Sequence, residues 1–164
     1  MGLLIWLMGF SLSGTMQAAG RPWTGPVDTL PVVFSIGQYS DEAEKLNLSH
    51  ISLMEVCNDE VLLAYDKWLH MLAELNDEAA DFGLDLKGTK FWFSVYWHHT
   101  GRIKHFAYYP KPGSKPIDYK VFEDLLSHFI DSYTLPVSSP EDFYNYGSAA
   151  FPIPSYRKPV ARQN

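Results

Sequence analysis

Residues 90–109 have the sequence KFWFSVYWHHTGRIKHFAYY, and this stretch decides the fold. Its two halves are rich in aromatic and β-branched residues, which favour β-strands, and the short segment His98–Gly101 separates them. Gly101 can adopt a positive φ angle that other residues adopt only with strain, so it suits a tight turn. The stretch therefore predicts a β-hairpin with a positive φ at Gly101.

The hairpin has an unusual number of aromatic side chains on both of its faces. Because side chains alternate between the faces of a strand, one face is predicted to carry Phe91, Phe93, Val95, Trp97, Ile103, Ala107 and Tyr109. The opposite face is predicted to carry Trp92, Tyr96, Phe106 and Tyr108. That second face either lies open as an interaction surface or is buried under a second layer. The number of expected helices favours burial.

A long amphipathic helix is expected before the hairpin, over residues 59–82. Apolar residues recur there at spacings of three and four, the period of one helix face: Val61, Tyr65, Trp68, Leu72, Leu75, Ala79 and Phe82. Asn58 is a candidate N-cap and Gly83 a candidate C-terminal stop. Trp68 and Leu72 lie centrally in this stripe, so both are predicted to be buried.

The segment after the hairpin predicts a second helix and a last strand. Several prolines and Gly113 end the second hairpin strand, and Asp118 can cap a helix over residues 119–133. The phrase 149–153 predicts a short strand, whose proline suggests a sheet edge. On the N-terminal side, residues 32–36 predict a short strand and the polar residues 41–45 a solvated helical turn.

The N-terminal segment resembles an export signal. Residues 3–10 are apolar and small residues follow up to Gly20, although residues 1–20 contain no Lys or Arg. We expect cleavage before Arg21 and a location in the periplasm or outside the cell. The expected organisation is a signal peptide (1–20), a Pro- and Gly-containing linker (21–31), a single domain (32–156) and a flexible polar tail (157–164).

Composition and motifs argue against several function classes. The net charge is −6 and the basic residues are scattered, so no nucleic-acid binding is expected. The sequence contains no nucleophile-elbow, P-loop or HExxH motif, so we expect no catalytic residues and no cofactor. No metal site is expected either, because adjacent His98 and His99 on a strand would point to opposite faces. The single cysteine, Cys57, excludes an internal disulfide and suggests a buried small side chain.

Residues 91–153 resemble the C-terminal domain of TonB and the TonB-like domains of bacterial envelopes. The matching features are Trp97, Gly101 and Ile103 around the hairpin turn, the helix 119–133, and the phrase Phe151-Pro152-Ile153. The resemblance implies a small antiparallel sheet packed by helices, with an edge that accepts a strand from a partner protein. TonB itself has a membrane helix and a long Pro-rich spacer, and these 164 residues show neither, so energy transduction is not expected.

The combined expectation is an α+β domain: a long helix, then a TonB-like hairpin, a helix and an edge strand. We expect a non-catalytic envelope protein that binds a partner protein, with membrane association only through that partner. The expected binding residues are Trp92, Tyr96, Phe106 and Tyr108 on the sheet face, and Phe151 and Ile153 at the edge. The alternative is a periplasmic or secreted binding protein or hydrolase for a small sugar or peptide.

Overall fold

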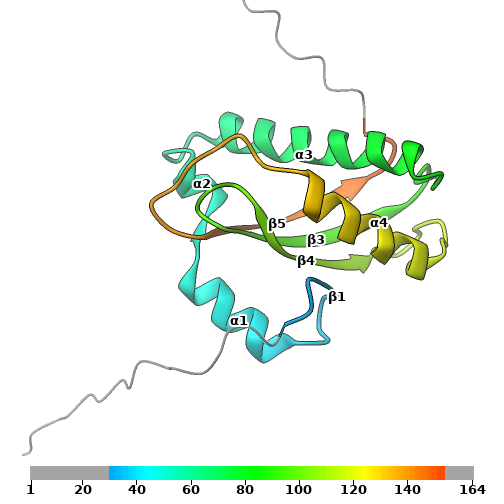
Figure 1. Ribbon diagram of the computed structural model, residues 1–164, viewed down its shortest axis with the longest axis horizontal. Coiled ribbons are helices and arrows are strands. Elements are labelled where there is room, and N and C mark those ends of the chain that lie inside the picture. The colour runs from blue at the N-terminus through cyan, green and yellow to red at the C-terminus, as the bar shows by residue number, and fades with distance from the viewer. Residues whose placement is uncertain (1–29, 154–164) are drawn as a thin grey trace, which may run out of the picture.

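A computed structural model describes residues 30–153. The expected signal peptide, nearly all of the expected linker and the expected tail lie outside these residues. The described residues form a mixed α/β fold in which one sheet is packed by helices on both faces (Figure 1).

The sheet has five strands in the order β1-β4-β3-β5-β2. The three central strands, β3 (Lys90–Trp97), β4 (Ile103–Pro110) and β5 (Phe143–Ala150), are antiparallel. The short outer strands β1 (Val33–Ser35) and β2 (Ile51–Ser52) run parallel to β4 and β5. The expectation of an antiparallel sheet therefore holds for the centre only, because both outer strands come from the segment before the long helix.

Two helices cover one face of the sheet, which we call the α3/α4 face. They are α3 (Val61–Asp81) and α4 (Tyr119–Ser132), and Figure 1 shows both on the same side of the strands. Burial of Trp68 and Leu72 on α3 is confirmed, since their exposed fractions are 5% and 1%. The cap of α4 is also confirmed, because the Asp118 carboxylate accepts hydrogen bonds from the first turn.

The start of α3 differs from the expectation. Asn58 does not cap the helix: Asn58 and Asp59 both have positive φ angles, and the helix begins at Val61. Val61 and Tyr65 are exposed, and Ala64 is the first buried position. The helix therefore begins later than expected. Of the expected apolar stripe, Trp68, Leu72, Leu75 and Ala79 are buried, whereas Val61, Tyr65 and Phe82 are exposed.

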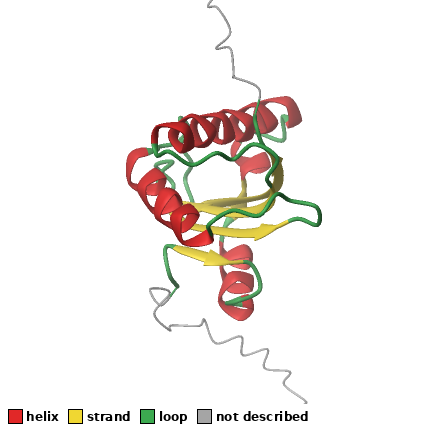
Figure 2. Cartoon of the chain, turned by 90° about the vertical axis from the view of Figure 1, so that its right-hand side faces the viewer, coloured by secondary structure: helices red, strands yellow, loops and turns green. Residues whose placement is uncertain are grey.

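The other face of the sheet, the α1 face, is covered by one helix, α1 (Ser40–Ser49), as Figures 1 and 2 show. Only Leu46 of α1 is buried, and it packs with Phe34, Tyr96 and Ala107. The polar segment expected to be a solvated turn is therefore part of a helix that covers sheet. Its polar residues face solvent while one leucine anchors it.

A short helix, α2 (Leu53–Val56), joins β2 to α3. It begins with a reciprocal capping box between Ser52 and Glu55. Cys57 follows it and is buried in the main core, with 3% of its surface exposed. Burial raises the pKa of its thiol, opposed by Lys67 and assisted by Glu60. The expectation of a buried cysteine is confirmed.

The hairpin turn is confirmed at Gly101, whose φ is +87°. The residue is constrained a second time, because a side chain there would collide with the Leu135 carbonyl group. The Leu135 N–H in turn donates to the Gly101 carbonyl (2.9 Å). The loop after α4 is thus bound to the hairpin turn.

The last strand lies elsewhere than expected. β5 begins at Phe143 and ends at Ala150, and it pairs with β3 along its whole length. Phe151, Pro152 and Ile153 follow the strand, so the expected edge strand at 149–153 is wrong. Asn145 and Gly147 lie within β5 and weaken its β-signal in the sequence.

Candidate functional site

The four aromatic residues expected on one face are divided between two faces. Tyr96 pairs with His105, but Trp97 pairs with Ile103, so Lys104 is an extra residue in the β4 strand. Such a bulge reverses the alternation of side chains beyond it. Phe106 and Tyr108 therefore lie on the α3/α4 face, while Ala107 and Tyr109 lie on the α1 face.

Phe106 and Tyr108 belong to the main core, with exposed fractions of 0% and 5%. The Tyr108 hydroxyl donates a hydrogen bond to Glu123 Oε1 on α4 (2.7 Å). Burial, followed by this hydrogen bond and the carboxylate charge, raises the pKa of Tyr108. Neither side chain is available to a partner in this fold, which corrects both assignments.

Tyr96 is on the α1 face but is covered. Its exposed fraction is 1%, and its hydroxyl donates to Asn47 Oδ1 on α1 (3.0 Å). The His50 ring contacts it edge-on, with ring centroids 5.9 Å apart. Tyr96 therefore anchors α1 to the sheet rather than forming a binding surface.

Phe151 and Ile153 are buried as well, with exposed fractions of 4% and 9%. The Phe151 ring lies edge-on to the rings of Phe91 and Phe93, in both cases at 6.5 Å between centroids. They close one end of the core, so the expected binding edge at these two residues is also corrected.

An exposed aromatic patch does exist, on the half of the α1 face that α1 leaves open. We define it as Trp92, Tyr109 and Tyr146. Trp92 is half-buried, and Tyr109 and Tyr146 are 47% and 58% exposed. Trp92 and Tyr109 pair across β3 and β4 with stacked rings 6.2 Å apart, and Lys111 Nζ lies 5.3 Å from the Trp92 ring.

Tyr146 reaches the patch from β5. It pairs with Ser94 on β3, and Ser148 pairs with Trp92. Cross-strand neighbours on the diagonal lie about 7–8 Å apart, within reach of aromatic side chains. The side chains between the aromatic ones on this part of the sheet, Ser94 and Ser148, are small.

The patch adjoins an open strand edge. β2 pairs only with Phe143 and Tyr144, so no described strand pairs with the outer side of β5 beyond Tyr144. We call residues Tyr146–Ala150 on that side the open edge of β5. An unpaired edge offers a row of N–H and C=O groups to an incoming strand.

The direction of these backbone groups follows from the hydrogen bonds at the end of the strand. The Phe151 N–H donates to the Thr89 carbonyl (2.9 Å) and the Phe151 carbonyl accepts from Gly88 (3.0 Å). Successive residues of a strand direct their N–H and C=O groups to opposite sides. Because Phe151 bonds toward β3, the other odd-numbered residues of β5 also direct their backbone groups toward β3. Ser148 and its even-numbered neighbours therefore direct theirs outward.

Of the expected binding residues, only Trp92 lies in the patch. Sequence reasoning missed Tyr109 because the Lys104 bulge gave it the wrong face. It missed Tyr146 because β5 was predicted to begin six residues late, at Ala149 rather than Phe143. An alternating FYNYG pattern at 143–147 was the available signal, with an aromatic residue at each even position.

The hairpin turn also brings the two adjacent histidines together. Both follow the last residue of β3, so strand alternation does not apply, and their ring centroids are 3.9 Å apart. Asp142 lies beside them. Its Oδ1 accepts a hydrogen bond from the backbone N–H of His99, and its Oδ2 accepts one from Lys104 Nζ, both at 2.9 Å. Burial alone would raise the pKa of Asp142, but these two contacts hold it below the usual value.

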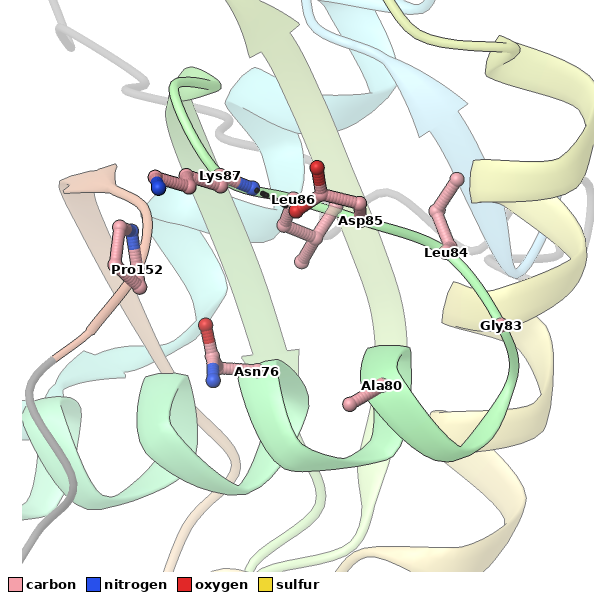
Figure 3. Close-up of a pocket in the computed structure, with 8 residues that line it drawn as sticks. All are labelled: Asn76, Ala80, Gly83, Leu84, Asp85, Leu86, Lys87 and Pro152. Atoms are coloured by element: carbon pink, nitrogen blue, oxygen red, sulfur yellow. Dashed lines mark hydrogen bonds between the residues drawn. The ribbon is translucent and has the colours of Figure 1, made fainter.

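A cavity of about 490 Å³ lies beside the C-terminal end of α3 (Figure 3). Its lining residues are Asn76, Ala80, Gly83, Leu84, Asp85, Leu86, Lys87 and Pro152. Asp85 is engaged by Lys115 Nζ (3.1 Å) and by the Lys87 N–H (2.9 Å). The lining offers one carboxylate and no histidine, so it does not supply the convergent acid–base groups that a hydrolase uses.

Within residues 30–153, no helix has both the length and the apolar character needed to cross a bilayer. Comparisons with protein-family models, with curated proteins and with solved structures gave no match to this chain.

Proposed function

We propose that this chain is an exported interaction module of a bacterial cell envelope. It binds a partner protein through the exposed aromatic patch and the open edge of β5. The observation that carries the proposal is the adjacency of the two features: Tyr146 belongs to both. An incoming strand that pairs with β5 would therefore place its side chains beside the aromatic rings.

The patch has the chemistry of a protein interface. Tyrosine and tryptophan are enriched among residues that dominate binding energy, and they lose little side-chain entropy when they are ordered. Trp92 is held by Tyr109 on one side and Lys111 above. A rigid aromatic anchor of this kind lowers the entropic cost of association.

The open edge of β5 supplies the second element of recognition. In strand addition, backbone hydrogen bonds provide affinity and alternate side chains provide specificity. The added strand would project alternate side chains onto the α1 face, where the patch lies. The resemblance to TonB-like domains also implies strand addition, and the proposal places the accepting edge at 146–150 rather than at Phe151 and Ile153.

The test is quantitative capture of envelope proteins by the full chain and by matched variants. Ser148→Pro removes one outward N–H and leaves the β3 ladder intact, because Ser148 does not bond to β3. Ser148→Ala is its control, since it keeps that N–H. A partner that binds by strand addition is captured by Ser148→Ala and lost with Ser148→Pro, while both variants keep the wild-type melting temperature.

The aromatic contribution has a control on another surface. Tyr146→Ala should reduce capture of the same protein by at least ~10-fold, the size expected when an interface hot spot is lost. Tyr65 on α3 is equally exposed at 58% and lies outside the patch, so Tyr65→Ala should have no effect. If capture of that protein is lost with Tyr65→Ala and kept with Tyr146→Ala, the interface lies at the start of α3 and the proposal is refuted.

Export is part of the same proposal and has its own test. The apolar segment 3–10 and the small residues before Arg21 support cleavage there. N-terminal sequencing of the mature protein from its native host should begin at or near Arg21. An intact Met1 in the mature protein would contradict it.

A further inference from the structure

The turn between β3 and β4 gathers two imidazoles and a carboxylate at one point. The candidate ligand atoms of His98, His99 and Asp142 all lie within 4.8 Å of one another. His99 Nδ1 lies 3.7 Å from Asp142 Oδ1. The cluster is at the end of β3 opposite to Trp92, so it is separate from the exposed aromatic patch.

Backbone hydrogen bonds fix this turn in place. The Gly101 N–H donates to the His98 carbonyl (2.8 Å), and the Leu135 N–H donates to the Gly101 carbonyl (2.9 Å). The Ser139 N–H donates to the His99 carbonyl (3.0 Å). The loop before β5 thus holds His99 and Gly101 from outside the hairpin, and Gly101 in turn holds His98. A fixed backbone reduces the entropy lost when the side chains converge on one ion.

The side chains around the cluster orient the candidate ligands. His98 Nδ1 lies 2.9 Å from Thr100 Oγ1, which leaves Nε2 of that ring for a ligand. Asp142 is positioned by the His99 N–H on Oδ1 and by Lys104 Nζ on Oδ2. Hydrogen bonds from a second layer of residues commonly orient metal-binding histidines and carboxylates in this way.

We propose that His98, His99 and Asp142 bind one divalent transition-metal ion, for which Zn²⁺ is the best match. Imidazole nitrogen and carboxylate oxygen are the ligand types that Zn²⁺ takes, whereas Mg²⁺ and Ca²⁺ prefer oxygen ligands throughout. Three protein ligands leave a coordination position for water.

Lys104 sets the strength of this site. Its ammonium group neutralises the carboxylate that the metal needs and repels the incoming cation. The site therefore binds Zn²⁺ more weakly than the same three ligands would without that lysine. Lys104→Met removes the ammonium charge and keeps an apolar side chain of similar length, so it should tighten Zn²⁺ binding several-fold.

The test is calorimetric titration of the untagged full chain with ZnCl₂ at neutral pH. Wild type should bind one equivalent, and His99→Gln should weaken binding by at least ~10-fold, because changing even an outer partner of a ligand commonly costs that much. His99 is the deciding position because its side chain is 49% exposed, so its replacement leaves the fold intact. A far-ultraviolet spectrum and a melting curve of each variant verify this.

The control is another exposed histidine that contacts a carboxylate. His128 Nδ1 lies 2.6 Å from Glu78 Oε1, and its side chain is 59% exposed. His128→Gln should keep wild-type Zn²⁺ affinity, whereas His98→Gln should weaken Zn²⁺ binding as His99→Gln does. The proposal is overturned if wild type takes up no stoichiometric Zn²⁺, or if affinity is unchanged in His99→Gln or lost in His128→Gln.

Discussion

The two faces of the sheet are built from the same strands and differ in how completely they are covered. The α3/α4 face carries a continuous core in which Phe91, Phe93 and Phe106 have no exposed surface. The α1 face is covered over one half, where Tyr96 and Ala107 lie under α1, and is open over the other half. The difference separates two settings for aromatic residues: on the α3/α4 face and under α1 they hold the fold, and on the open half of the α1 face they are exposed.

Truncating a large core side chain on the α3/α4 face should give the largest loss of stability. Phe93→Ala removes a ring that stacks on Phe91 (5.4 Å) and meets Phe106 edge-on (5.1 Å). We expect the free energy of unfolding to fall by ~3–5 kcal/mol, because the neighbouring rings cannot close the cavity. Urea unfolding monitored by tryptophan fluorescence measures it. A loss below ~1 kcal/mol would mean that this face is not the main source of stability.

The covered half of the α1 face should give an intermediate effect. Leu46→Ala removes the one buried side chain of α1. We expect a loss of ~2 kcal/mol, at the low end for leucine truncation, because α1 can settle onto the sheet. Hydrogen exchange should show faster exchange of α1 amides than of α3 amides. Equal acceleration in both helices would show that the two faces unfold as one unit.

The open half of the α1 face should give the smallest mutational effect on stability. Tyr146→Ala removes a side chain that is 58% exposed, so unfolding should change by less than ~0.5 kcal/mol. Loss of partner binding without loss of stability would sharpen the distinction between the two faces. A destabilisation similar to that of Leu46→Ala would instead place Tyr146 in the core.

A pH effect of small size is expected from His50, which packs on Tyr96. Burial first, and then the charge of Lys104, lower the pKa of His50 below 6.5. The unfolded chain therefore takes up a proton on His50 before the folded protein does. Stability should fall as the pH drops below about 6.5, the ordinary histidine value. Between pH 7 and pH 5, the melting temperature should depend less on pH in His50→Gln than in wild type. An unchanged pH dependence would exclude His50 as its source.

The sequence was informative where a periodic pattern ran without interruption. The α3 stripe around Trp68 and Leu72 and the turn at Gly101 were predictable, since burial and positive φ leave local signatures. The faces of β4 were not, because a bulge at Lys104 depends on pairing with β3 and has no local pattern. One extra residue was enough to exchange the faces of Phe106 and Tyr109.

The candidate sites were missed for a related reason: each depends on residues distant in the chain. Asp142 reaches His98 and His99 only because the loop after α4 crosses the hairpin turn. Gly147 in β5 looks unfavourable for a strand, yet a side chain there would lie within 3.0 Å of the Trp68 ring. Its absence of a side chain is a requirement of α3 packing, which the local sequence does not reveal.

Because Cys57 is buried, the reactivity of its thiol reports how often the surrounding structure opens. The thiol is the single one in the chain and is 3% exposed. A thiol reagent can reach it only after α2 and the start of α3 separate from the core, and the raised pKa slows any direct reaction further. The rate of labelling of the unmodified protein therefore measures how often this region opens, without an introduced probe.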